Sequence, residues 1–154
     1  MSPRTQNTDA TSNHITKMKE DALNLIEEAI AYMKANGKDA ALKAFNKQEG
    51  AFVKGELYVF ALDYQGVLLA NMNNPDAVGK NLNDAQDSEG VYFNKNLIAK
   101  AKSGGGWVTY RYQNPTTKKI GCKNSYVMPT DMDYLLGVGY YFPENPDTHQ
   151  CEAQ

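Results

Sequence analysis

Residues 104–128 constrain the fold more than any other part of the chain, because they read as one long β-hairpin. Two segments rich in aromatic and β-branched residues, 107–112 and 120–128, flank the turn sequence Asn-Pro-Thr-Thr. A run of three glycines before the first strand permits a sharp reversal into it. The aromatic and cationic side chains of this hairpin are the first candidates for a binding surface.

The N-terminal part of the chain carries a helical pattern. Apolar residues recur at steps of three and four from Ile15 to Met33, which predicts an amphipathic helix from about residue 13 to the stop at Asn36-Gly37. Residues 1–12 are polar, and we expect a disordered lead-in there. Shorter helices are predicted at 38–46 and 91–102.

Three more strands are predicted outside the hairpin, at residues 56–63, 67–72 and 134–142. Both faces of the first are apolar, so it should be central and covered on both sides. The elements together predict an α+β fold, an antiparallel sheet of about five strands with the helices on one side. Residues 143–154 are expected to form an irregular C-terminal tail.

Composition narrows the class of protein. A chain of 154 residues with 42% hydrophobic and 22% charged residues fits one domain with its own core. A net charge of −2 gives no positive field, so no nucleic-acid partner is expected. No stretch reaches the roughly 18 to 20 apolar residues needed to span a bilayer, and the first twelve residues lack the apolar region of a signal peptide.

Four segments, taken in order, resemble the single Cache domain of bacterial extracytoplasmic sensors. They are the strand-turn-strand with Asp63 and Gly66, the sequence Gly-Lys-Asn-Leu at 79–82, Gly-Gly-Gly-Trp at 104–107, and Lys123 followed by Ser-Tyr-Val. The resemblance covers about residues 15–142 and defines a domain at 13–142. It implies a PAS-like antiparallel sheet with a long N-terminal helix and shorter helices packed on it. It also implies a periplasmic location, with a signal peptide or membrane anchor outside this chain.

The resemblance also suggests ligand-binding residues. It makes Lys123 face the ligand, although spacing alone is typical of a solvated strand lysine. Strand alternation puts Trp107 and Arg111 on the opposite face from Tyr110. Trp107 and Tyr110 can reach one pocket only if the glycine-rich entry is bulged or Trp107 sits at the end of the strand. Arg111 has the alternative of a cross-strand ion pair. The full candidate set is Lys123, Tyr110, Tyr126, Trp107, Arg111, Tyr112, Tyr58, Phe60, Asn71 (where the family commonly has His) and Tyr140.

The two cysteines, Cys122 and Cys151, form an even count in a chain that the resemblance places outside the cytoplasm. A disulfide between them would tie the tail to the hairpin; the alternative is two unrelated thiols in a reducing compartment. Their spacing matches no Cys-x-x-Cys motif, and only His14 and His149 could join them. No metal site is therefore expected.

No catalytic motif or cofactor motif occurs in the sequence, so no enzyme and no cofactor are expected. We expect an extracytoplasmic sensor domain that recognises a short monocarboxylate such as acetate, lactate or pyruvate. It would signal to a membrane partner or to a signalling domain outside this chain, and could form a homodimer through the N-terminal helix. The alternatives are a free-standing exported binding protein without an output domain, an enzyme on the same scaffold, and an interaction domain whose pocket its own side chains fill.

Overall fold

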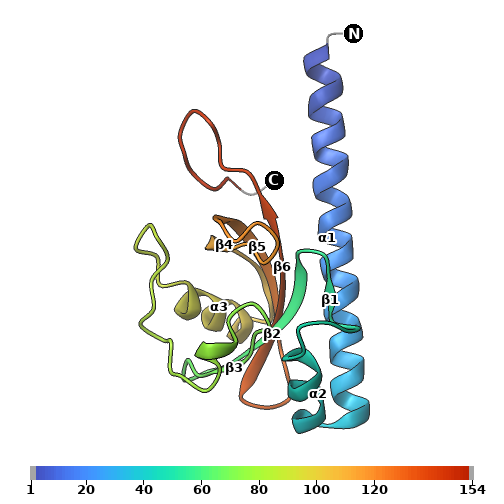
Figure 1. The fold of residues 1–154 in the computed structure, drawn as a ribbon, viewed down its shortest axis with the longest axis vertical. Coiled ribbons are helices and arrows are strands. Elements are labelled where there is room, and N and C mark those ends of the chain that lie inside the picture. The colour runs from blue at the N-terminus through green and yellow to red at the C-terminus, as the bar shows by residue number, and fades with distance from the viewer. Residues whose placement is uncertain (1–2, 153–154) are drawn as a thin grey trace.

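The computed structural model describes residues 3–152 and shows one long helix lying along a twisted antiparallel sheet (Figure 1). The helices are α1 (Pro3–Asn36), α2 (Lys38–Phe45) and α3 (Phe93–Lys102), with a short 3-10 helix η1 (Pro75–Ala77). The strands are β1 (Val53–Lys54), β2 (Leu57–Asp63), β3 (Leu68–Ala70), β4 (Gly106–Gln113), β5 (Ile120–Pro129) and β6 (Tyr134–Phe142). The predicted α+β class is confirmed, and the sheet has six strands in the described chain.

The last strand of the chain lies in the middle of the sheet. The strand order is β1-β2-β6-β5-β4, β3 pairs with β2, and every pairing is antiparallel. All nine residues of β6 are buried, as its nearly unbroken apolar sequence requires. The strands β2, β5 and β6 therefore hold residues far apart in sequence side by side.

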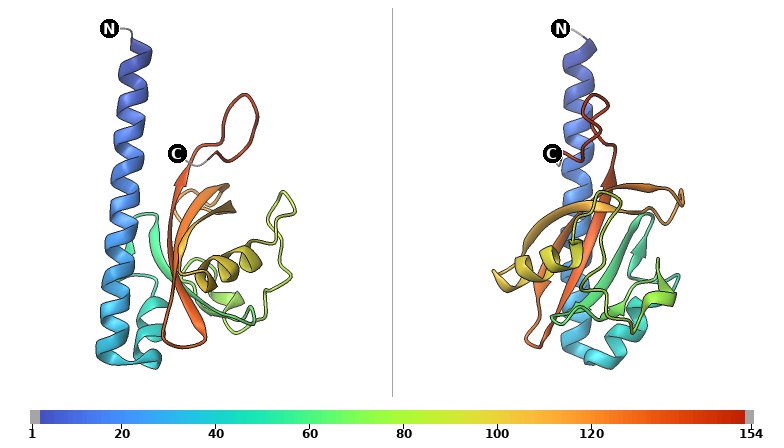
Figure 2. Two further views of the ribbon diagram at one scale, coloured as in Figure 1. Left: turned by 180° about the vertical axis from the view of Figure 1, so that it is seen from behind. Right: turned by 90° about the vertical axis from the view of Figure 1, so that its left-hand side faces the viewer.

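The helices cover both faces of the sheet, so the prediction that they lie on one side is wrong. Helices α1 and α2 cover one face, and α3 with the segment that leads to it covers the other (Figures 1 and 2). The reason lies in β2 and β6, whose apolar side chains point to both faces and divide into two buried clusters. Each cluster needs its own cover to exclude water.

Helix α1 begins at Pro3, where the sequence pattern predicted a start near residue 13. Proline fits the first turn of a helix, and residues 4–12 contain neither glycine nor proline to stop it. The structure therefore places helix, and not a disordered lead-in, at residues 3–12. Residues 1–2 lie outside the described residues.

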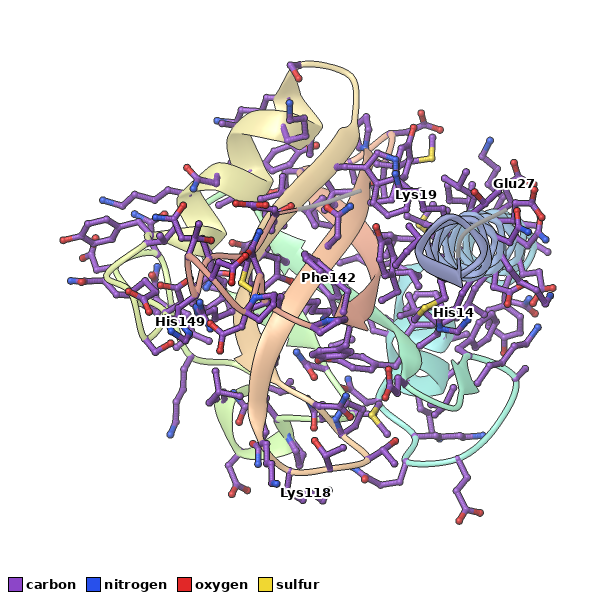
Figure 3. The ribbon with its side chains drawn as sticks, turned by 90° about the horizontal axis from the view of Figure 1, so that it is seen from above. His14, Lys19, Glu27, Lys118, Phe142 and His149 are labelled. Carbon is purple, nitrogen blue, oxygen red and sulfur yellow. A yellow bond between two sulfur atoms is a disulfide. The ribbon has the colours of Figure 1, made fainter. Side chains whose placement is uncertain are left out.

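The C-terminal tail from Pro143 has no helix or strand over its described part, which ends at residue 152. Cys122 and Cys151 form a disulfide with a Cα–Cα distance of 5.5 Å, so the predicted pairing is confirmed. Viewed down the long helix, His149 of this tail lies on the opposite side of the molecule from α1, with Phe142 at the end of β6 between them (Figure 3).

Candidate ligand-binding site

The strand register brings a lysine and several tyrosines together on the face that α3 covers. Lys123 of β5 lies directly opposite Tyr110 of β4 on one side and Tyr141 of β6 on the other. Directly opposed residues point to the same face of a sheet. Tyr58 of β2 faces this side as well, since its hydroxyl accepts a hydrogen bond from Lys123.

The side chain of Lys123 is enclosed, with only 1% of its surface exposed. Its Nζ donates to the hydroxyl of Tyr58 at 3.0 Å. The same Nζ lies 4.4 to 5.9 Å from the centroids of five aromatic rings, close enough for cation–π attraction. The rings are those of Tyr58, Phe60, Tyr110, Tyr112 and Tyr141.

Glycine in the neighbouring strand makes room for this lysine. A Cβ atom at Gly139 would lie 2.7 Å from Cε of Lys123 and closer still to the Ser125 hydroxyl. Real Cβ atoms do not approach other atoms so closely, so a larger residue at position 139 would have to displace the Ser125 hydroxyl and the end of the lysine side chain.

Lys123 has no carboxylate partner among the residues that the structure describes. None of the ion pairs among the described residues includes it, and burial lowers its pKa from 10.5 to about 7. A buried charge is costly unless an opposite charge compensates it. Near neutral pH the charged and neutral forms of the lysine are therefore similar in free energy, and a bound anion would favour the charged form.

A cavity of about 170 Å³ opens beside Lys123. It lies between the sheet and α3, with the polar segment before α3 as its outer wall. Its lining is mostly apolar, with three asparagines among it: Phe60, Leu62, Leu68, Asn71, Asn74, Leu82, Ala85, Gln86, Phe93, Asn94, Leu97, Tyr110, Tyr112 and Lys123. Pockets for drug-sized ligands have about 300 to 1,000 Å³, so this cavity suits a molecule of only a few heavy atoms.

Tyr112 is a second hydrogen-bond donor on the cavity wall. Its hydroxyl oxygen accepts from Nδ2 of Asn71 at 3.3 Å and from Nδ2 of Asn74 at 3.4 Å. With both lone pairs engaged, the hydroxyl can only donate its own hydrogen, and no acceptor for it lies among the described residues. Burial raises the pKa of Tyr112, which keeps the hydroxyl protonated at neutral pH.

The remaining tyrosine hydroxyls already have partners in the protein. Tyr110 shares a hydrogen bond of 2.9 Å with the Ser125 hydroxyl, and Tyr141 donates to the Gln113 carbonyl at 2.8 Å. Burial raises the pKa of Tyr58, Tyr110 and Tyr141, so none of them supplies a negative charge to Lys123 near neutral pH.

Four of the ten candidate residues lie away from this cavity. Trp107, Tyr126 and Tyr140 lie on the face that α1 covers, where the Trp107 ring contacts the Tyr126 ring at 5.2 Å and the Tyr140 ring at 5.7 Å between centroids. Strand β4 pairs with β5 without a bulge, so strand alternation separates Trp107 from Tyr110. Arg111 faces the C-terminal tail instead. It forms ion pairs with Glu89 at 3.6 Å and Glu144 at 3.2 Å, which lie in the segment before α3 and in the tail, so these pairs are not the cross-strand pair considered as the alternative.

The structure adds Tyr141, Asn74 and Asn94 to the candidate set. Tyr141 and Tyr140 are adjacent tyrosines of one strand, and only the register with β5 decides which of them faces Lys123. Asn94 sits on the inner side of α3, which the apolar spacing around Phe93 and Leu97 could have indicated. In the described part of the chain, no group of His, Cys, Asp and Glu side chains is arranged to hold a metal ion.

A family model described as Single Cache domain 2 matches residues 5–146. The chain belongs to this single Cache family. As a Cache domain it is 32% identical over 149 residues to the sensor histidine kinase MctS of Rhizobium johnstonii, an alignment that covers 88% of the chain and 32% of the kinase. The chain thus spans about a third of the length of that relative.

A second relative is the methyl-accepting chemotaxis protein CtpM of Pseudomonas aeruginosa, 35% identical over 63 residues, or 41% of this Cache domain and 11% of CtpM. Among solved structures, a methyl-accepting chemotaxis protein from Vibrio parahaemolyticus matches with a TM-score of 0.75 and 23% identity, covering 87% of the chain and 95% of that structure. A Cache chemosensory domain solved for its carboxylic acid recognition matches with a TM-score of 0.64 and 22% identity, covering 91% and 99%. Both show the same fold.

Cache sensor domains of chemoreceptors and histidine kinases bind ligands and are not catalytic. The expectations of a Cache fold and of a sensor domain that binds ligands without catalysis are therefore confirmed for this domain. No helix in the described chain combines the length and the apolar character needed to cross a membrane.

Proposed function

We propose that this Cache domain binds a short monocarboxylate, with Lys123 as the counter-ion of the carboxylate. One observation carries the proposal: a fully buried lysine, caged by aromatic rings, has no carboxylate among its described neighbours. A charge-assisted hydrogen bond to a carboxylate contributes about 1.5 to 3 kcal/mol. The Tyr112 hydroxyl, which can only donate, would bind the second carboxylate oxygen.

The lining of the cavity favours one carboxylate over other ligand chemistries. Lys123 is the one cation that lines it in the described chain, so a dicarboxylate would leave a second charge uncompensated. No acidic side chain among the described residues lines it, so the ammonium group of an amino acid would have no partner. The apolar walls of Phe60, Leu62 and Leu68 suit a short carbon chain. Acetate, propionate, lactate and pyruvate match these requirements.

The relatives support an extracytoplasmic sensor that signals occupancy to a membrane-linked partner or to a further domain. One solved neighbour is a periplasmic sensor domain, and another recognises carboxylic acids. Strand β6 offers a route for the signal, because Tyr141 faces the ligand side and its neighbour Tyr140 packs in the cluster beneath α1. Helix α1 has 34 residues and projects beyond the sheet, so its free end is the proposed site of homodimer contact and of signal output.

A thermal-shift screen tests the proposed ligand class. The purified protein, freed of carried-over ligand by unfolding and refolding, is heated with C2 to C4 monocarboxylates, dicarboxylates and amino acids. Ligand at 100 times its Kd stabilises a protein by about 2.7 kcal/mol, which raises Tm by several degrees. We expect a shift with short monocarboxylates only. A shift confined to amino acids or dicarboxylates, or none at all, would contradict the proposal.

A further inference from the structure

Asn94, at the start of α3, is a buried polar side chain with an unused hydrogen-bond acceptor. Only 4% of its surface is exposed, and it lines the cavity beside Lys123. Its Nδ2 donates to the backbone carbonyl of Leu82 at 2.9 Å. Because that carbonyl only accepts, the amide nitrogen must occupy this position, and the orientation of the amide is fixed. The oxygen Oδ1 accepts no hydrogen bond from any described residue.

The free oxygen of Asn94 faces the cavity. No fully enclosed side-chain nitrogen or oxygen in the described chain lacks a partner, so Oδ1 of Asn94 must border open space. The space that this residue lines is the cavity. Asn74 also lines it, but Asn74 is only half-buried and also borders an outer hollow, where solvent can reach its amide oxygen.

We propose that Asn94 accepts a hydrogen bond from a hydroxyl group of the ligand, so that the site prefers a hydroxy monocarboxylate to the same acid without the hydroxyl. This inference rests on the proposed carboxylate site. The ligand-facing groups then divide by chemistry. Lys123 and Tyr112 donate to the carboxylate, and Asn94 accepts from the substituent. An oxo acid such as pyruvate presents only acceptors and cannot satisfy Asn94.

Apolar groups on the same wall keep the hydroxyl close to Asn94. Leu82 and Leu97 line the cavity beside it, and Asn94 itself is fixed by the bond to the Leu82 backbone. A site that is built to hydrogen-bond a ligand hydroxyl discriminates strongly against the analogue without it, because the buried protein group then loses its partner. We therefore expect a preference of about tenfold or more.

Isothermal titration of the wild-type protein with matched acids tests the inference first. Lactate and 3-hydroxypropionate are compared with propionate, which has the same chain without a hydroxyl, and with pyruvate, which carries an oxo group. We expect at least one hydroxy acid to bind about tenfold more tightly than propionate and pyruvate. Equal affinities for all four acids would overturn the role of Asn94 and leave the carboxylate site standing. If none of the four binds, the proposed function fails and the inference fails with it.

The Asn94→Leu variant then tests which residue is responsible. It should reduce the ratio of hydroxy-acid to propionate affinity to about one, while propionate itself still binds. The ratio is the readout because a general loss of stability would weaken both ligands alike. Asn94→Ala serves the same purpose if the leucine variant does not fold. Asn96, exposed on the same helix, is the matched control, and Asn96→Leu should keep the wild-type ratio. A preference that survives in the Asn94 variants would overturn the inference.

Discussion

At the scale of single residues, Lys123 is a buried side chain whose charged form is destabilised in the protein without a ligand. Its stem is held between β4 and β6, its Nζ has one hydrogen-bond partner, and its charge has no counter-ion in the described chain. Side chains in such positions are retained more often for function than for stability. Two pH dependences follow, one for the free protein and one for binding.

The stability of the ligand-free protein should increase with pH above neutrality. Burial lowers the pKa of Lys123 to about 7 in the folded state from 10.5, so between these values the unfolded state binds more protons. The free energy of unfolding then rises with pH across this window, and the penalty for the buried charge is full below it. Urea titrations from pH 6.5 to 9.5 check this. The Lys123→Met variant should lack that rise. A wild-type slope that equals the slope of the variant would contradict the account.

Affinity for a monocarboxylate should fall as pH rises above about 7. The carboxylate binds the charged form of Lys123, and the free protein loses that proton above its pKa of about 7. Binding then takes up a proton, and Kd should increase about tenfold per pH unit. Isothermal titration from pH 6.5 to 9, in buffers with different ionisation enthalpies, measures both the affinity and the proton uptake. Constant affinity with no proton uptake would contradict the expectation.

The sequence alone predicted only some of the residues of the candidate site. The resemblance placed Lys123 and Tyr110 together, and the structure puts them side by side. It also suggested Trp107 and Tyr126, which point to the other face because strand alternation continues through β4 and β5 without a bulge. The alternation of residues between the two faces of each strand can be read from the sequence, but the register between strands that are distant in the chain cannot. The choice of Tyr140 over Tyr141 depended on that register.

At the scale of elements, strand β6 shows how glycine shapes the sheet. Phe60 of β2 lies directly opposite Gly137 of β6. A Cβ at Gly137 would come within 2.7 and 2.8 Å of two ring carbons of Phe60. The end of the ring therefore packs directly against the glycine, and Phe60 forms part of the cavity wall beside Lys123.

Gly137→Ala should destabilise the protein. The new methyl group would force the Phe60 ring out of its position, and overpacking of this kind costs about 1 to 3 kcal/mol. Urea denaturation measures the loss. Gly121 of the neighbouring strand is the matched control, because a Cβ there would meet only Tyr141 at an ordinary 3.9 Å, so Gly121→Ala should be nearly neutral. Equal stability of both variants would show that the Phe60 contact is not tight.

The elements themselves were largely predictable because their patterns are local. The strands at 56–63 and 134–142 and the helix at 91–102 were predicted to within about two residues of β2, β6 and α3. Strand β1 has two residues and no periodicity to detect. The apolar pattern of 56–63 correctly predicted that both faces of this strand are covered. The prediction that all helices lie on one side of the sheet was inconsistent with that pattern.

At the scale of the whole molecule, the C-terminal tail is tied to β4 and β5, and its His149 lies far from the long helix in the view down that helix (Figure 3). Arg111 donates to the His149 backbone carbonyl at 2.6 Å and pairs with Glu144, and the Cys122–Cys151 disulfide fixes the end of the tail. Cys122 immediately precedes Lys123 in β5. The tail is thus covalently joined to the strand that carries the proposed ligand cation.

Reduction of the disulfide should lower the free energy of unfolding. The crosslink spans a sequence separation of 29 residues, for which chain entropy predicts a stabilisation of about 3 to 4 kcal/mol. Urea titrations with and without reductant measure the difference. The Cys151→Ala variant should match the reduced wild-type protein and should not respond to reductant. Unchanged stability after verified reduction would contradict the prediction.

The central claim, that Lys123 provides the charge for a carboxylate ligand, is tested most directly by isothermal titration of Lys123→Met at pH 6.5. Methionine keeps most of the length and removes the charge, so the affinity for the best short monocarboxylate should fall about 10- to 100-fold, corresponding to a lost charge-assisted bond. Lys119→Met, at an exposed position just before β5, is the control and should bind as the wild type does. Unchanged affinity in a folded Lys123→Met protein would contradict the account.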